Sequence, residues 1–233
     1  MVRDSTAARA FVAAALVALW TCGAFAQRAP GADELSAYRG LFAAAAQGDP
    51  ARIAQLAAAG ERVAARDGHG RTPLHVAAFA GKVEAMSALV VAGADPNALE
   101  GDRYDIVTIA AVVNDLPTLD AALALGGSAR NVTSRYDGTA LIAAAHLGHA
   151  EVVRRLIRAG APLDHVNNLG WTALIESIVL GDGGPAPLAT LQALLGAGAN
   201  PNLADRSGAT PLALARARGY TAMANALVAK GAR

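Results

Sequence analysis

Cysteine, aromatic residues and charge are all scarce in this chain of 233 residues. Cys22 is the single cysteine, aromatic side chains make up 4% of the sequence, and charged side chains make up 17%. One cysteine excludes an internal disulfide and a cluster of thiolate metal ligands. The formal net charge of +1 gives the chain no general electrostatic attraction to nucleic acid or to an anionic membrane.

The N-terminal residues have the three parts of an export signal. Arg3 and Arg9 give a positive start, and an apolar run follows from Phe11 to Trp20. Ala24 and Ala26 place small residues at the two positions that a signal peptidase reads. The run is too short for a bilayer of roughly 30 Å, which takes about 20 helical residues. We expect residues 1–26 to be a signal peptide cleaved after Ala26, and the mature protein to be periplasmic or secreted without membrane insertion.

Cys22 offers an alternative, in which the chain is a lipoprotein. That hypothesis is weaker, because Trp20 and Thr21 stand where small residues are expected before a lipidated cysteine. Cleavage after Ala26 leaves no cysteine, and therefore no thiol nucleophile and no Cys-ligated metal. It also removes two arginines and one aspartate, so 20 − 2 = 18 basic residues balance 19 − 1 = 18 acidic ones. We expect no nucleic-acid partner.

Glycine-type turn positions recur in two interleaved series with a unit of 33 residues. Successive differences are 33, 33, 34, 33 and 38 in the first series and 33, 33, 34, 38 and 33 in the second. The first series is Gly48, Gly81, Asn114, Gly148, Gly181 and Gly219; the second is Gly60, Gly93, Gly126, Gly160, Gly198 and Gly231. A fixed period of this length is typical of a stacked helical repeat, whose units bury their apolar faces only against their neighbours.

The second unit, residues 67–99, shows the complete pattern. Thr72 is predicted to cap the first helix, and Pro73 at the first helical position loses only an N–H that has no helical partner. Gly81 and Gly93 are predicted to end the two helices in left-handed turns. His75 is expected to bond within the turn that enters the helix, and His149 is expected to have a similar structural role.

This pattern resembles the ankyrin repeat over about residues 36–233. The string Asp67-x-x-Gly-x-Thr-Pro-Leu-His, the alanine pair after it and the Gly-Ala before Asp95 match the family motif almost position by position. The resemblance implies an all-α solenoid of about six helix-turn-helix units with extended β-turn loops. After a flexible segment 27–35, the predicted units are 36–66 (capping), 67–99, 100–133 (degenerate), 134–166, 167–204 and 205–233 (capping). In the degenerate unit Asp105 replaces the capping Thr, and Asn114 replaces the helix-end Gly.

The fifth unit breaks the period. Gly181 and Gly198 are 17 residues apart, whereas the spacing in other units is 12. The insertion at 182–187 contains Pro185 and Pro187, so we expect a longer loop between the two helices. It is either a tolerated surface insertion, which we favour because loop length costs little entropy, or a recognition loop.

No arrangement typical of an enzyme or a metal site is visible. The five histidines lack the spacing of metal ligands, and the serines lack the glycines of a nucleophile elbow. We therefore expect no catalytic residues, no metal and no cofactor. Glu176 lies where the repeat usually has an apolar residue, so we expect it to be partly buried and hydrogen-bonded to a backbone amide or to Asn168.

The variable positions of the ankyrin motif predict the surface that binds a partner. Carried over one residue at a time, they select His69, Arg71, Phe79, Tyr104, Tyr136, His146, Trp171, Leu180, Arg206 and Arg218. Tyr, Trp and Arg are the side chains that anchor interfaces. Packing of Tyr136 and Trp171 against the adjacent loop is the alternative.

The resemblance implies an exported, monomeric module that binds an unidentified protein through its concave face. The alternative is an accessory factor for an exported redox or haem enzyme such as a catalase. Gly170 to Glu176 and the glycine-rich insertion resemble exported bacterial ankyrin proteins, some of which are associated with protection against oxidants.

Overall fold

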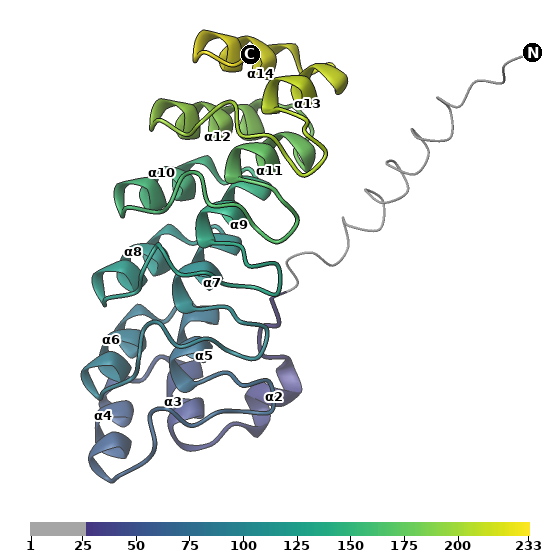
Figure 1. The fold of residues 1–233 in the computed structure, drawn as a ribbon. Coiled ribbons are helices and arrows are strands. Elements are labelled where there is room, and N and C mark those ends of the chain that lie inside the picture. Colours follow the sequence, from purple (N-terminus) through teal and green to yellow (C-terminus); the bar gives the residue numbers. More distant parts are fainter. Residues whose placement is uncertain (1–26) are drawn as a thin grey trace, which may run out of the picture.

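The computed structural model describes residues 27–233, which form a stack of helix pairs (Figure 1). The predicted signal peptide and Cys22 lie outside the described residues. The only β-type pairing in the described residues is an isolated bridge between Thr133 and Gly138, so the predicted all-α solenoid is confirmed. No helix between residues 27 and 233 is both long and apolar enough to cross a membrane.

Each unit contributes one inner and one outer helix. The inner helices are α3 (Gly40–Gln47), α5 (Pro73–Phe79), α7 (Ile106–Val112), α9 (Ala140–His146), α11 (Ala173–Val179) and α13 (Pro211–Ala217). The outer helices are α4 (Pro50–Ala58), α6 (Val83–Val91), α8 (Leu116–Ala124), α10 (Ala150–Arg158), α12 (Pro185–Gly196) and α14 (Thr221–Ala229). In Figure 1 the outer helices form the left column, the inner helices the middle column, and extended loops project to the right.

Side-chain caps begin the inner helices α5, α7, α9, α11 and α13, as the sequence predicts, whereas α3 has no side-chain cap. The Thr72 hydroxyl accepts from the His75 N–H, and the Asp105 carboxylate accepts from the Thr108 N–H at 2.8 Å. A cap satisfies a backbone donor that the first helical turn leaves without a partner. At the other end of the first helix in their units, Gly81 and Asn114 have φ values of 63° and 58°. The predicted left-handed helix ends are therefore confirmed at both positions.

His75 is buried and joins its own turn to the next loop. Its Nε2 lies 3.0 Å from the Ala98 carbonyl oxygen, and its Nδ1 accepts from the Thr72 N–H at 3.1 Å. This assignment places the ring proton on Nε2. Burial lowers the pKa of His75 from 6.5 to about 4. His149 has a similar role, with Nδ1 at 3.1 Å from the Ala111 carbonyl oxygen. The structural roles predicted for both histidines are confirmed.

We expect His75 to make the fold sensitive to mild acid. Its folded pKa is below its unfolded value, so its contribution is complete above about pH 6.5 and is lost as the pH falls toward about 4. The pKa difference of 6.5 − 4 = 2.5 corresponds to a loss of roughly 3 kcal/mol in the free energy of unfolding. Urea unfolding at several pH values, compared with His75→Gln, measures it. An equally steep loss of stability between pH 6.5 and 4 in the variant would contradict the assignment to His75.

Leucine and alanine fill the space between the helices. Leu74, Leu141 and Leu174 occupy the same position in α5, α9 and α11, and each is at most 1% exposed. The alanines beside them, such as Ala77 and Ala144, are fully buried. Small side chains let neighbouring helices approach closely, and each helix packs mainly against helices of its own and the adjacent unit.

The insertion of the fifth unit lengthens both the loop and the second helix: residues 180–184 separate α11 from α12, whereas only residues 147–149 separate α9 from α10. Helix α12 has 12 residues, whereas α10 has 9. Pro185 occupies the first helical position and Pro187 the third, where a backbone N–H has no helical partner and its loss costs nothing. The predicted longer loop is therefore confirmed for residues 182–184, whereas residues 185–187 are helical, because prolines that interrupt a helix interior are tolerated in its first turn.

The segment that precedes the first unit is also more structured than the sequence indicates. Residues 27–35 were expected to be flexible, but α2 (Ala32–Ala37) begins within them. Glu34 accepts a hydrogen bond from the Gly31 N–H at 2.8 Å and closes the first turn of this helix. Helix α2 lies beside the loops at the N-terminal end of the stack (Figure 1).

Candidate protein-binding surface

Extended loops link the outer helix of each unit to the inner helix of the next, and we call them fingers. They comprise residues 66–71, 99–104, 132–138, 166–171 and 204–209. The first four are joined by backbone hydrogen bonds of 2.9 Å, from Gly101 to His69, from Ser134 to Arg103 and from Asn168 to Tyr136. This ladder fixes the finger backbones before any partner arrives, which lowers the entropic cost of binding.

Carboxylate and amide side chains also brace individual fingers. Glu100 accepts from the Tyr104 N–H at 3.0 Å, and Asn167 accepts from the Trp171 N–H at the same distance. Asp205 plays the equivalent part for Ala209 in the last finger, again at 3.0 Å. One side-chain oxygen thus closes each of these turns, as Asx turns do.

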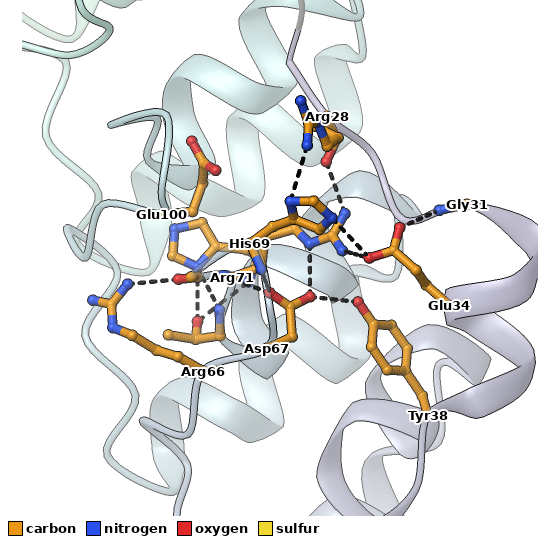
Figure 2. A network of polar contacts seen from close by, with 12 residues as sticks. Arg28, Gly31, Glu34, Tyr38, Arg66, Asp67, His69, Arg71 and Glu100 are labelled. Carbon is orange, nitrogen blue, oxygen red and sulfur yellow. Dashed lines mark hydrogen bonds and ion pairs between the residues drawn. The ribbon is translucent and has the colours of Figure 1, made fainter.

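The finger of the second unit is occupied by the chain's own N-terminal segment (Figure 2). The Arg71 guanidinium contacts Glu34 of α2 and donates to Asp67 at 2.7 Å. Tyr38 donates its hydroxyl proton to Asp67 at 2.6 Å, and His69 lies 3.4 Å from Glu34. The arginine side chain has no exposed surface.

The ionisation of these groups follows from their contacts. The hydrogen bond from the Gly31 N–H and the pairing with Arg71 lower the pKa of Glu34. Burial opposes the ionisation of Asp67, but the hydrogen bonds from Tyr38 and Arg71 outweigh it and lower its pKa. Both carboxylates are therefore charged near neutral pH and attract the guanidinium.

Two of the predicted partner-binding residues are buried. Arg71 is enclosed by α2 and its own finger, and Tyr104 is 5% exposed within the core cluster. Burial raises the pKa of Tyr104 to about 12. Both residues occupy variable positions of the motif, which is why the sequence selected them. The motif does not indicate whether a variable side chain is covered by other parts of the chain. Neither side chain offers surface to a partner in this structure.

The other predicted residues lie on the fingers or at the ends of the inner helices. Tyr136 lies 5.6 Å below the Arg135 guanidinium, measured to the ring centroid. Arg218 donates to the Val179 carbonyl oxygen at 3.1 Å. Arg206 is exposed, whereas His69, Phe79, His146, Trp171, Leu180 and Arg218 are partly buried. The structure brings His146, Trp171 and Tyr136 to adjacent units, while His69 belongs to the α2 contact.

Glu176 forms a buried polar cluster behind this surface. It is 1% exposed, accepts from the Asn167 side chain at 2.9 Å, and lies 3.1 Å from His146 Nδ1. The expected burial and hydrogen bonding are confirmed. The expected partner Asn168 was wrong, because Asn168 donates instead to the Arg135 carbonyl oxygen at 2.9 Å.

Apolar side chains that the predicted set omits are also exposed here. Val113 and Leu147 follow the last residues of α7 and α9 and are 53% and 39% exposed. Val132 and Val166 begin two fingers and are similarly exposed. The helix-end residues occupy variable positions of the motif, which is a signal for them. The two finger valines precede the motif's first position, so the predicted set left them out.

The described residues contain no group of three or more His, Cys, Asp or Glu side chains that could hold a metal ion. What the structure does present is a rigid row of fingers with aromatic, aliphatic and arginine side chains. These features define a helical-repeat protein with a surface suited to binding another macromolecule.

Comparisons with known proteins identify the family. A family model described as "Ankyrin repeats (3 copies)" matches residues 107–204, and one described as "Ankyrin repeat" matches residues 69–100. The putative ankyrin repeat protein YahD of Escherichia coli (strain K12) is 36% identical over 190 residues, which cover 81% of this chain and 94% of YahD. The chain belongs to the ankyrin-repeat family, whose repeats indicate a protein–protein interaction module.

Solved structures agree with this assignment. An ankyrin repeat domain from Acinetobacter baumannii AYE is 44% identical, with a TM-score of 0.77, and the match covers 83% of this chain and 98% of that one. The ankyrin repeat domain of Bcl-3, described as a unique member of the IκB protein family, is 29% identical with a TM-score of 0.75. That match covers 84% of this chain and 87% of the Bcl-3 domain.

Proposed function

We propose that this chain is an exported module that binds a partner protein through the fingers and inner-helix ends of units 3 to 6. The finger ladder carries this proposal, because it fixes the backbones of the fingers on which Tyr136 and Trp171 lie. Rigid aromatic and arginine side chains are the usual anchors of protein interfaces. The α2 contact restricts the proposed surface to the later units, since it occupies the finger of unit 2.

Export is the second part of the proposal and rests on the pattern of residues 1–26. N-terminal sequencing of the protein recovered from outside the cytoplasm is expected to begin at Gln27. A mature N-terminus at a lipidated Cys22, or an intact Met1, would contradict the predicted cleavage after Ala26. The accessory role for a redox or haem enzyme gains no observation of its own from the described residues. It stays a sequence-based prediction.

Photo-crosslinking in the producing cell tests the binding proposal. We expect a photoreactive phenylalanine analogue at position 136 to capture a discrete protein, because this position lies on the finger row. The matched control is position 91, where Val91 is 88% exposed at the end of outer helix α6. Capture from position 91 but not from position 136 would place binding on the outer side and contradict the proposal.

A further inference from the structure

Four arginines on the finger side of the solenoid lack a carboxylate partner among residues 27–233. We call Arg66, Arg135, Arg206 and Arg218 the arginine row. Arg66 donates to the carbonyl oxygens of Gly70 and Leu99 at 2.6 and 2.8 Å, and Arg218 donates to that of Val179. Carbonyl contacts fix the position of a guanidinium but leave its charge without a counter-charge.

The two remaining arginines of the row rest on neighbouring groups. Arg135 lies over the Tyr136 ring. The methylene groups of Arg206 pack against Gly170 so closely that a β-carbon at position 170 would clash with them. These contacts hold the side chains over the fingers of units 4 and 5. Each guanidinium is therefore positioned before binding, and less side-chain entropy is lost when it pairs with an anion.

The outer side of the solenoid treats its arginines differently. On α10, Arg154 pairs with Glu151 at 2.8 Å and Arg158 with the same carboxylate at 3.6 Å, while Arg155 pairs with Asp120 of α8. The pairing with these arginines lowers the pKa of Glu151. Charge on α10 is thus balanced within the chain, whereas the arginines of the row form no ion pair.

The α2 contact shows what a carboxylate does on a finger. Glu34, carried on a helix, reaches both Arg71 and His69 of the unit 2 finger (Figure 2). Asp137, on the unit 4 finger, is paired with Arg103 at 3.0 Å, and Glu176 is buried. Neither is available to neutralise Arg135 or Arg206.

We infer that the partner presents an acidic segment to Arg135, Arg206 and Arg218, with Tyr136 and Trp171 contacting the segment between its carboxylates. This inference rests on the proposed function and specifies the class of partner. A planar guanidinium matches a carboxylate in a bidentate pair, and opposite charges also accelerate encounter. A protein segment fits better than a nucleic acid, because three separate arginines on a chain with a formal net charge of +1 do not form the continuous basic stripe that follows a phosphate backbone.

A fluorescent glutamate-rich helical peptide and its glutamine counterpart are the probes, measured by anisotropy with the full chain. We expect the glutamate peptide to bind saturably at low ionic strength, more weakly as salt increases, and the glutamine peptide to bind far less. The variant Arg135→Glu with Arg206→Glu is expected to lose affinity by roughly tenfold or more.

The matched control is Arg52→Glu with Lys230→Glu, which changes the net charge equally on the outer helices and is expected to retain binding. Absence of binding by the glutamate peptide, or equal weakening by both double variants, would overturn the inference. So would tighter binding of a single-stranded oligonucleotide of the same charge. If crosslinking from position 136 succeeds while these charge effects are absent, the surface is correct and the acidic partner class is wrong.

Discussion

Replacement of Arg71 by alanine is expected to detach α2 from the solenoid and to lower the free energy of unfolding by roughly 3 kcal/mol, the lower end of the cost of removing one partner from a buried ion pair. The lower end applies because Asp67 keeps other donors, including Tyr38 and the backbone N–H of His69. Glu34 would lose its arginine partner, and the space left by the buried side chain would add to the cost.

Urea unfolding and hydrogen exchange of residues 32–38 measure this effect. The matched control is Arg103→Ala. Arg103 is also a finger arginine that pairs with a carboxylate of another segment, in this case Asp137 of the next finger. That pair is 47% and 49% exposed, so its loss is expected to cost at most about 1 kcal/mol. If both variants lose equal stability, or if exchange in α2 is unchanged in Arg71→Ala, the network does not hold the N-terminal segment.

The combined change Trp171→Ala with Tyr136→Ala is expected to weaken binding of the crosslinked partner by about 30-fold or more. Truncation of an anchor residue of an interface costs about 2 kcal/mol or more of binding free energy, which corresponds to this factor. Both side chains are only partly buried, and both residues lie in fingers, outside the helices. Helical circular dichroism and the melting temperature are therefore expected to stay close to those of the unchanged chain.

Loss of helical signal in this variant would mean that Tyr136 and Trp171 support the fold. That outcome would favour the alternative hypothesis, in which both rings pack against the adjacent loop. The backbone of the Trp171 finger is held independently of the ring, through the Asn167 side chain and the bond from Asn168 to Tyr136. We therefore expect the finger to keep its shape.

The repeat architecture follows from local rules that recur along the chain. A capping residue such as Thr72 or Asp105 begins an inner helix, and a residue that tolerates positive φ ends it. These signals act within a few residues, so the sequence alone predicts the helix boundaries. The degenerate third unit shows this well, because Asp105 and Asn114 replace the usual residues and perform the same tasks.

Long-range contacts explain what the sequence did not predict. Helix α2 has no place in the repeat, and its position depends on Arg71, which lies 37 residues beyond Glu34. The same contact buries Arg71, which the motif had assigned to the binding surface. Glu176 was expected to bond Asn168 but bonds Asn167, because adjacent residues of a finger point in different directions.

We propose that the fingers of the later units bind a partner protein. The most direct measurement is the affinity of the crosslinked partner for Trp171→Ala with Tyr136→Ala, beside a control on the outer side, Val91→Ala with Arg154→Ala. We expect the finger variant to bind far more weakly with its fold intact, and the control to bind like the unchanged chain. Equal binding by both variants, or weaker binding by the outer-side control alone, would contradict it.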